Sequence, residues 1–294
     1  PFAAYVQKLG RPIFFLMVLI MCLLATTELG TDSWITPLMT GEMDAVGISA
    51  GWVLVYTSLI MMVLRFSAGP IVHAFKPLTL LAGSALLAAV GLYLLGSVSG
   101  FVPIFAVATL YGVGKTFFWP ATLGVISEQF PKSGALGINM IAGIGMLFVG
   151  TIGAPWLGYV QDVDTNSTLK ADHSAVYEET VANTQTKSFL GLIDYKSVDE
   201  TNATPGEKET IATVQDASKK TVLRTATILP ITMLVAYLLL MTYFNSQGSY
   251  KPIELMGGQV AEAATGEASA EITPATDWGD SAAEGDAGGD AGGD

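Results

Sequence analysis

The sequence contains little of what soluble enzymes and disulfide-rich secreted proteins depend on. Its 294 residues include one cysteine and two histidines, and only 14% of them are charged. The lone Cys22 excludes an intrachain disulfide. Histidine, cysteine and carboxylate residues show no metal-ligand spacing, so we expect neither a metal nor another cofactor. Soluble domains carry about a quarter charged residues, and this shortage excludes an ordinary water-soluble domain.

The acidic residues are concentrated in two segments, although the formal net charge of the chain is −12. From Gly257 onward there are nine acidic and no basic residues, and residues 161–224 hold eleven acidic and seven basic ones. A nucleic-acid-binding chain would need a basic patch, so we expect no nucleic-acid partner. The chain ends in the low-complexity sequence GDAGGDAGGD, and we expect residues 246–294 to form a disordered acidic tail.

Long apolar runs are what the sequence has instead. Six of them reach about 18 residues or more with few charges, the length at which a helix crosses a bilayer core about 30 Å thick. Two runs join without a charge, and we divide them at residues 96–100, where glycine and serine mark a turn. The sequence therefore predicts an all-α membrane protein with six transmembrane helices, over residues 12–39, 50–74, 77–96, 101–128, 134–160 and 225–244.

Basic residues predict which side of the membrane each short loop occupies, because lysine and arginine stay on the cytoplasmic side. They occur before the first helix and in every second connection, at Lys8, Arg11, Lys76, Lys132 and Lys251. We therefore expect a multi-pass protein of the cell membrane (inner or plasma) with both termini in the cytoplasm. Residues 1–160 then hold helices one to five, 161–224 a partly helical extracytoplasmic loop, and 225–245 the sixth helix.

Two short motifs resemble nucleotide-binding or catalytic sites and are better explained by helix structure. GVGKT at residues 112–116 resembles a phosphate-binding loop, but that motif requires a preceding strand and a glycine where Thr109 stands. GISAG at residues 47–51 matches a nucleophile pattern. Its Ser49 lacks a base, since His73 is expected on the opposite side of the membrane, and we interpret Ser49 as a helix cap. We expect no enzymatic activity.

Charged residues within the apolar runs are the strongest functional signal. Each costs about 2.5–3.5 kcal/mol at the membrane centre, so such residues face a cavity or a partner. Glu28 and Asp32 share one face of the first helix, and Tyr111, Lys115 and Trp119 share one face of the fourth. Either Glu28 and Lys115 form a buried pair that only joins two helices, or these residues bind a solute or a proton. Intramembrane ionisable groups mark transport paths, which favours the second interpretation.

Other residues of the apolar runs have structural explanations. Arg65 lies nearer the end of the second helix and can anchor it at the membrane surface. Pro120 is expected to kink the fourth helix. Gly150, Ala154 and Gly158 have a four-residue spacing, and we expect them to form a ridge of small residues that allows close helix packing.

The chain resembles one half of a transporter of the major facilitator superfamily. It is similar to the helix-loop-helix signature of such a half at Glu128, Pro131, Lys132, Gly134, Gly137, Gly150, Pro155, Gly158 and Asp162. The segment RFSAGPIVHAFKP, residues 65–77, resembles the cytoplasmic loop between a half's second and third helices, so a gating role is implied for Arg65, Gly69 and His73. It departs from that loop at His73 and Ala74, where aspartate and arginine are usual, a weakening that is commoner in the second half.

The resemblance implies the second half of a twelve-helix transporter that works by alternating access in the lipid bilayer, with an N-terminal six-helix half missing upstream. It places the first and fourth helices, with Glu28, Asp32 and Lys115, around a central cavity. Glu28 is then the proton-responsive or solute-binding carboxylate, with Lys115 as counter-charge and Tyr111 and Trp119 in contact with the solute. The expected function is secondary active transport of a small polar solute (a sugar, nucleoside or organic anion), coupled to protons.

A second function stays open at this point. Residues 161–224 are longer than most connections between helices, as a partner-binding segment would be. The alternative is therefore a membrane scaffold or sensor that transports nothing and binds a partner through this segment.

Overall fold

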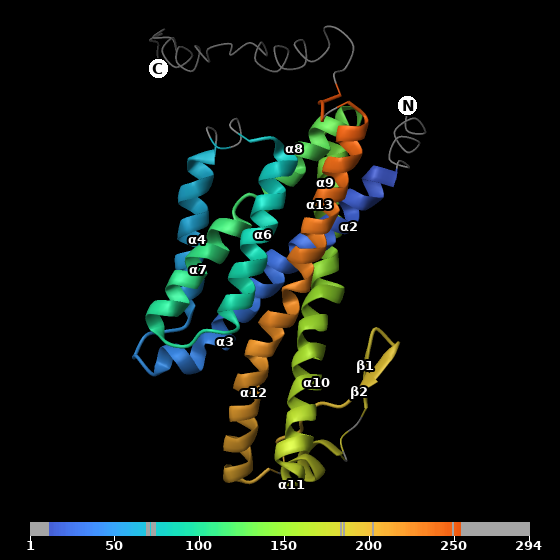
Figure 1. Ribbon diagram of the computed structural model, residues 1–294. Coiled ribbons are helices and arrows are strands. Elements are labelled where there is room, and N and C mark those ends of the chain that lie inside the picture. The colour runs from blue at the N-terminus through green and yellow to red at the C-terminus, as the bar shows by residue number, and fades with distance from the viewer. Residues whose placement is uncertain are drawn as a thin grey trace, which may run out of the picture. The chain divides into compact units, whose positions relative to one another are not determined.

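The computed structural model describes residues 12–68, 71, 75–182, 184, 186–201, 203–248 and 250–253. Gly69, His73 and the acidic tail beyond Ile253 lie outside the described residues, and so do the expectations placed on them. The described part is almost entirely helical (Figure 1). Its elements, with η for 3-10 and π turns, are α2 (Pro12–Ala25), η1 (Thr26–Gly30), α3 (Thr31–Asp44), α4 (Gly51–Phe66), α6 (Pro77–Leu95), α7 (Phe101–Lys115), α8 (Phe118–Gln129), η2 (Pro131–Ser133), α9 (Gly134–Phe148), η3 (Val149–Gly153), α10 (Ala154–Asp172), α11 (Ser174–Tyr177), η4 (Glu178–Ala182), β1 (Lys187–Phe189), β2 (Ile193–Tyr195), α12 (Pro205–Ala226) and α13 (Ile228–Ser246).

Five helical segments of the described part are long and apolar enough to cross a membrane: Pro12–Pro37, Pro77–Leu95, Phe101–Gln129, Pro131–Asp172 and Pro205–Ser246. Five of the six expected spans are therefore present as helical segments of suitable length and composition. The exception is the second, expected over residues 50–74, where α4 has only 16 residues. At 1.5 Å per residue this is about 24 Å, less than the hydrocarbon core.

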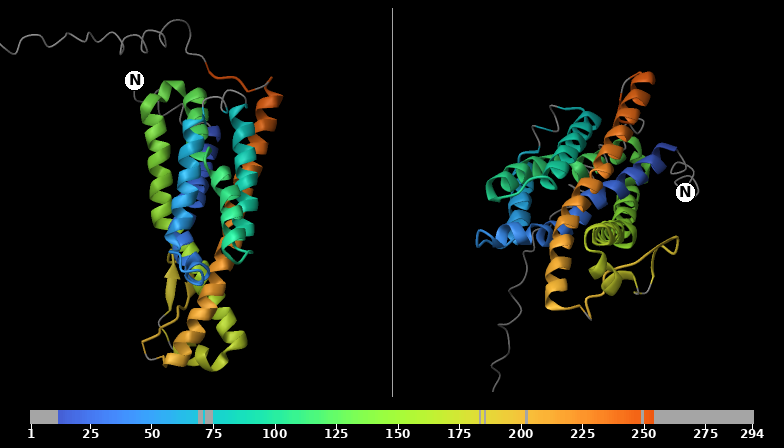
Figure 2. Two further views of the ribbon diagram at one scale, coloured as in Figure 1. Left: turned by 90° about the vertical axis from the view of Figure 1, so that its left-hand side faces the viewer. Right: turned by 60° about the horizontal axis from the view of Figure 1, so that its bottom comes forward.

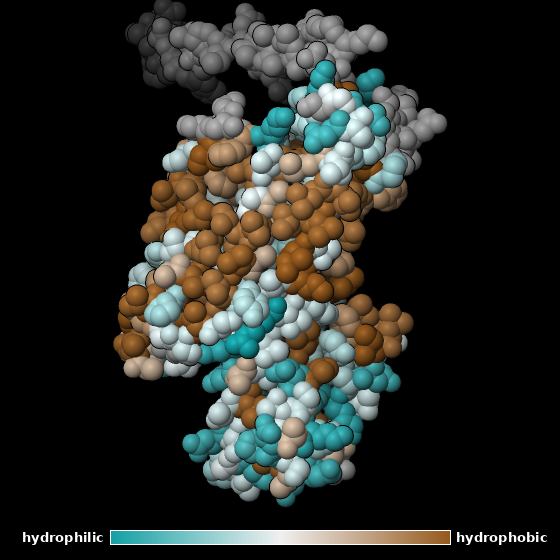
Figure 3. All heavy atoms as spheres, in the orientation of Figure 1, coloured by the Kyte–Doolittle hydropathy of each residue, from teal (hydrophilic) through white to brown (hydrophobic). Residues whose placement is uncertain are grey.

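These segments and α4 pack into one helical bundle (Figures 1 and 2). Helix α6 is central, because it contacts α7, α8 and α13, while α2 packs against α9 and α13. The face in Figure 3 is apolar over the bundle and hydrophilic over α10 and α12 beyond it. Exposed side chains such as Leu147 (69%) and Phe66 (86%) on the bundle suit an apolar surrounding, lipid or protein, better than water.

Close contact between α6 and α7 depends on two glycines. A Cβ atom added at Gly91 of α6 would lie 2.7 Å from the Cα atom of Tyr111 on α7, and one at Gly114 of α7 would lie 2.9 Å from the Cα atom of Ala88 on α6. Glycine at these points lets the two backbones touch. The contact fixes the position of α7, which carries Tyr111 and Lys115.

We expect Gly91→Ala to lower the free energy of unfolding by about 1–3 kcal/mol, because the new methyl group meets backbone atoms that cannot rotate away. Gly83→Ala is the matched control on α6, since nothing lies within 4 Å of its added Cβ atom. The control should unfold at or slightly above the wild-type temperature. Thermal unfolding followed by tryptophan fluorescence in detergent measures both, and equal midpoints for the two variants would contradict the packing.

The fourth expected span is broken in the middle. Helix α7 ends at Lys115, two turn residues follow, and α8 begins at Phe118. Pro120 lies in the first turn of α8 and has no amide hydrogen, so it cannot donate to the carbonyl of Thr116. The kink expected at Pro120 is therefore seen as a break just before it.

The predicted loop over residues 161–224 is largely helical. Helix α10 continues to Asp172, and α12 runs from Pro205 into α13 with a single turn residue between them. The two helices pack against each other, and a small apolar cluster joins them to the connecting segment, formed by Leu169, Val181, Ile211 and Val214. We call residues 161–226 the helical extension.

Hydrogen bonds define where α12 begins. Thr204 and Glu207 form a capping box, in which the Thr204 amide donates to the Glu207 carboxylate at 2.7 Å and the Glu207 amide donates to the Thr204 hydroxyl at 3.4 Å. The donated hydrogen bonds from Thr204 hold the pKa of Glu207 below its usual value. The predicted cap at Ser49 is wrong: Ala50 precedes α4 without a side-chain cap, and Ser49 offers only its carbonyl, to the Trp52 amide at 3.1 Å.

The short connections that carry lysine residues lie at one end of the bundle. The start of α6, the α8–α9 link and the chain after α13 lie there (Figure 1), and the Gln129 side chain donates to the Lys251 carbonyl at 3.0 Å. The α6–α7 turn lies at the other end, where Arg224 of α12 donates to the Gly96 carbonyl at 2.9 Å. The alternation of ends follows the charge pattern, and the side of the membrane that each faces stays a prediction.

Candidate functional site

A π-helical turn interrupts the first long helix where its polar residues lie. In a regular α-helix the amide of Thr31 would donate to the carbonyl of Thr27. At η1 it donates instead to the carbonyls of Thr26 and Glu28. The Thr27 carbonyl instead accepts hydrogen bonds from the hydroxyl groups of Tyr111, at 2.7 Å, and Thr31, at 2.5 Å. Tyr111 is fully buried, so this bond ties the first helix to α7. Such π turns frequently occur at functional sites.

Lys115 lies one turn further along α7 and is completely buried. Its ammonium group donates to both carboxylate oxygens of Asp32, at 2.5 and 2.7 Å, and lies 5.2 Å from the centre of the Tyr111 ring. The Asp32 side chain is 18% exposed. A cation in this position needs the carboxylate, because an unpaired buried charge is strongly destabilising.

Glu28 pairs with a different helix. One of its carboxylate oxygens, Oε1, accepts a hydrogen bond from the Arg65 guanidinium of α4 at 3.3 Å. The side chain of Glu28 is 5% exposed, and that of Arg65 is 40% exposed. The second oxygen of Glu28, Oε2, is buried and has no hydrogen-bond partner among the described residues. A buried carboxyl oxygen without a partner is a place where a proton or a ligand can bind.

Arg65 also binds the break between α7 and α8. Its Nε atom donates to the carbonyl of Thr116 at 3.1 Å. This is the carbonyl that Pro120 leaves without an intrahelical donor. A single guanidinium therefore joins the helix break to Glu28, and three helical segments meet at one cation.

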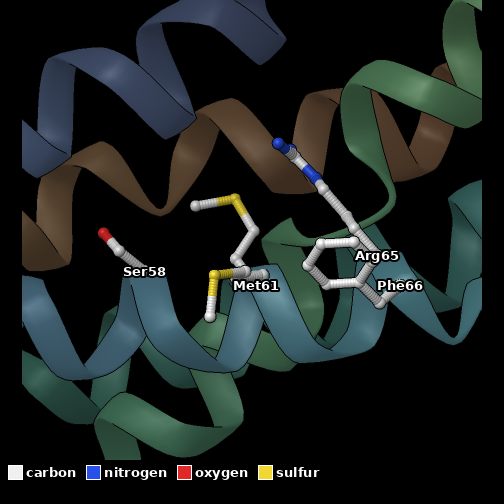
Figure 4. A pocket seen from close by; sticks show the side chains of 5 residues that line it. Ser58, Met61, Arg65 and Phe66 are labelled. Carbon is white, nitrogen blue, oxygen red and sulfur yellow. The ribbon is translucent and has the colours of Figure 1, made fainter.

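An open cavity lies beside Arg65 on α4, with a volume of about 380 Å³. The side chains of Ser58, Met61 and Arg65 project from the same side of α4 (Figure 4). The lining residues are Ser58, Met61, Met62, Arg65 and Phe66. Its volume lies within the range of small-molecule sites, about 300–1,000 Å³, but all of its lining residues come from α4, so it is an open groove on one helix rather than an enclosed site.

The structure brings most of the predicted site residues together but pairs them differently. Glu28, Asp32, Tyr111 and Lys115 are all buried or nearly so around η1 and the end of α7. The pair considered between Glu28 and Lys115 is wrong, since Lys115 binds Asp32 and Glu28 binds Arg65. Arg65 itself reaches into the bundle, so anchoring at the surface does not describe its position.

Trp119 lies beyond the helix break, half-buried against the apolar core. The break disrupts the face that it was expected to share with Tyr111 and Lys115. Its contact with a solute stays a prediction.

The ridge of small residues expected on the fifth span is only partly correct. An added Cβ atom at Gly150 would meet nothing within 4 Å, and one at Gly158 would only touch Trp34 at 3.9 Å. The close approach is instead at Gly153 in η3, where an added Cβ atom would lie 2.8 Å from Cγ2 of Thr26 in η1. Pro155, two residues later, cannot donate to the carbonyl of Thr151, which explains a π turn at this point.

Sequence reasoning missed the hydroxyl groups that fix Tyr111 and the methionines that line the cavity. Thr27 and Thr31 flank Glu28 at a four-residue spacing, a signal that a polar patch surrounds the carboxylate. The role of Thr116 could have been inferred from Pro120, because a proline always leaves the carbonyl four residues earlier without its donor. No such signal marked Met61 and Met62, which are ordinary residues of an apolar helix.

The described residues contain no group of three or more histidine, cysteine or carboxylate side chains that could hold a metal ion. Comparison with protein-family models, with curated proteins and with solved structures finds no match to this chain. The chemistry of the site therefore rests on its own geometry: a buried lysine paired with Asp32, a buried Glu28 paired with the half-exposed Arg65, one buried carboxyl oxygen without a partner among the described residues, and an adjoining open groove.

Proposed function

We propose that the protein is a secondary active transporter that moves a small polar solute across a membrane with protons. The observation that carries this proposal is the buried oxygen Oε2 of Glu28, which has no hydrogen-bond partner among the described residues. It lies within a helix long enough to cross a bilayer, next to the Arg65 cation. A carboxyl group in this position can take up and release a proton, which is the property that a proton-coupled carrier requires.

The charges of the site favour an organic anion over a sugar or a nucleoside as the solute. Arg65 and Lys115 carry two positive charges, and Glu28 and Asp32 carry two negative charges when both are ionised, so the four groups are neutral together. A proton on Glu28 leaves one positive charge. Because Lys115 is held by both oxygens of Asp32, the excess charge belongs to Arg65 at the cavity, where an anion would complete the balance.

The same contacts provide a route for alternating access. Arg65 joins α4 to the carbonyl of Thr116 at the break in the fourth segment and to Glu28 at the π turn of the first. Protonation of Glu28 weakens its bond to Arg65 and so frees α4 to move against the first segment, while the bond from Arg65 to Thr116 keeps α4 attached to the fourth. Helix breaks and π turns are where a helix bends most easily.

The location and the complete architecture are part of this proposal. The chain would be a multi-pass protein of the cell membrane, with a fold like the C-terminal six-helix half of a major facilitator superfamily symporter. A second six-helix half would cover the exposed apolar faces of α4 and α9, which carry Phe66 and Leu147. Both termini would be cytoplasmic, and the helical extension extracytoplasmic.

Uptake by the full-length gene product in proteoliposomes tests the proposal. With an acidic exterior, we expect accumulation of a radiolabelled monocarboxylate or dicarboxylate above its equilibrium level, abolished by a protonophore. A labelled hexose and a labelled nucleoside serve as comparison solutes, and accumulation of either instead would reassign the solute class. If no labelled solute accumulates or exchanges, transport is contradicted and the scaffold function is favoured, for which the helical extension, packed around a small apolar cluster of its own, would supply the surface.

A further inference from the structure

A short β-hairpin in the helical extension has an unusual turn. Strands β1 and β2 are antiparallel, and the Leu192 amide donates to the Phe189 carbonyl at 3.1 Å across the turn. The two central residues of the turn, Leu190 and Gly191, have φ of 55° and 68°. Glycine adopts this left-handed conformation readily, whereas leucine is sterically disfavoured there, and asparagine or glycine is usual. Backbone preference therefore does not explain why leucine occupies position 190 of this turn.

The side chains of the turn are apolar and exposed. Leu190 is 51% exposed, Leu192 is 83% exposed and Ile193 is 45% exposed. No charged residue separates them. An exposed apolar tip of this kind gains nothing in water, so it indicates contact with something outside the chain.

Contacts with α10 orient the hairpin along that helix. Tyr159, near the start of α10, stacks on Phe189 beside the turn, with ring centres 5.3 Å apart. Asn166, seven residues further along α10, donates to the carbonyl of Lys196 at the other end of the hairpin. Seven residues correspond to about 10 Å along a helix. The turn therefore points back toward the start of α10, that is, toward the apolar bundle, as Figures 1 and 2 show.

Tyr159 also marks the boundary between apolar and polar surface. Before it α10 carries Trp156 and Leu157, and after it come Gln161, Asp162 and Asp164. Tryptophan and tyrosine are enriched at the membrane–water interface, and a bilayer around the apolar bundle would end near Tyr159. Figure 3 shows apolar surface beside this boundary, at the place where Figure 1 shows the hairpin turn.

We propose that the hairpin turn, residues 190–193, inserts into the adjacent leaflet of the bilayer and anchors the helical extension to the membrane surface. The occupant is lipid, because the turn lies at the interface of the bundle's own apolar belt and has only aliphatic side chains and glycine. Amphipathic elements of this kind reach about 5–10 Å into the boundary between headgroups and acyl chains. This inference rests on the helices crossing a bilayer, and it does not depend on transport.

Spin labelling of the full chain in phospholipid vesicles tests the insertion. In a Cys22→Ala background, a nitroxide at Leu192→Cys reports the turn, and one at Ala212→Cys, exposed on α12 in the helical extension, is the matched control. We expect the label at position 192 to collide several-fold more often with oxygen, which dissolves in lipid, than with a water-soluble nickel chelate. The label at position 212 should show the reverse.

Leu190→Asn adds a second test that does not endanger the fold, because asparagine accepts the left-handed conformation of the turn. Combined with the label at position 192, it should raise collision with the nickel chelate while thermal unfolding stays unchanged. Equal exposure to the chelate at positions 192 and 212 would overturn the proposal. Protection of position 192 from both reagents would overturn it too, since that result indicates burial against another protein copy.

Discussion

Lys115→Met is expected to lower the free energy of unfolding by about 3–5 kcal/mol, because it leaves the Asp32 carboxylate without its counter-charge in a largely buried position. The ammonium group of Lys115 has no exposed surface, and water cannot replace it without entering the core. Thermal or urea unfolding of the purified variant, followed by tryptophan fluorescence in detergent or nanodiscs, measures the loss. The variant should also yield less folded protein in the membrane.

Two controls distinguish the effect of breaking the Lys115–Asp32 ion pair from the effect of replacing a lysine side chain. The double variant Asp32→Asn/Lys115→Met removes both charges and should recover most of the stability, because neither group is left unpaired. Lys219→Met breaks an ion pair of similar length, 2.7 Å to Asp216, at a solvent-exposed site of α12, and should change stability by less than about 0.5 kcal/mol. A double variant no more stable than Lys115→Met would show that Asp32 is not the partner that matters.

The residue types of the site could be predicted from the sequence, but their partners could not. Glu28, Asp32 and Lys115 stand out because charges are rare within apolar runs. Placing both acids on one face assumed 3.6 residues per turn throughout. The π turn at residues 26–30 breaks that assumption, so Asp32 meets α7 while Glu28 meets Arg65 on α4. A prediction that assumes 3.6 residues per turn throughout cannot detect a π turn, in which the number of residues per turn is larger.

The helices could be predicted where a run of apolar residues marks them. They could not be predicted where only contacts with other helices stabilise them. Apolar runs located five spans, and glycine and serine located the turn between α6 and α7. Helix α10 continues 13 residues past Tyr159, through polar sequence. Its support there is lateral, from α12 and the small apolar cluster between them. These contacts are between residues about forty positions apart in the sequence, so no local sequence pattern predicts them.

Glu28→Gln is expected to abolish proton-driven uptake in proteoliposomes while leaving the protein folded in the membrane. The amide keeps the shape of the side chain and an oxygen that can accept the hydrogen bond from Arg65. It cannot take up or release a proton, so the step that alternates the charge of the site is lost. Exchange of labelled for unlabelled solute, which needs no net proton movement, should continue at a measurable rate.

Asp44→Asn is the matched control, because Asp44 is an exposed carboxylate at the end of the helix that carries Glu28. It should accumulate solute as the wild type does. If Glu28→Gln accumulated solute to the wild-type level under the same pH gradient, the proton would have to bind elsewhere, and Asp32 is the remaining acid of the site. If both accumulation and exchange were lost with the protein folded, Glu28 would bind the solute itself rather than the proton.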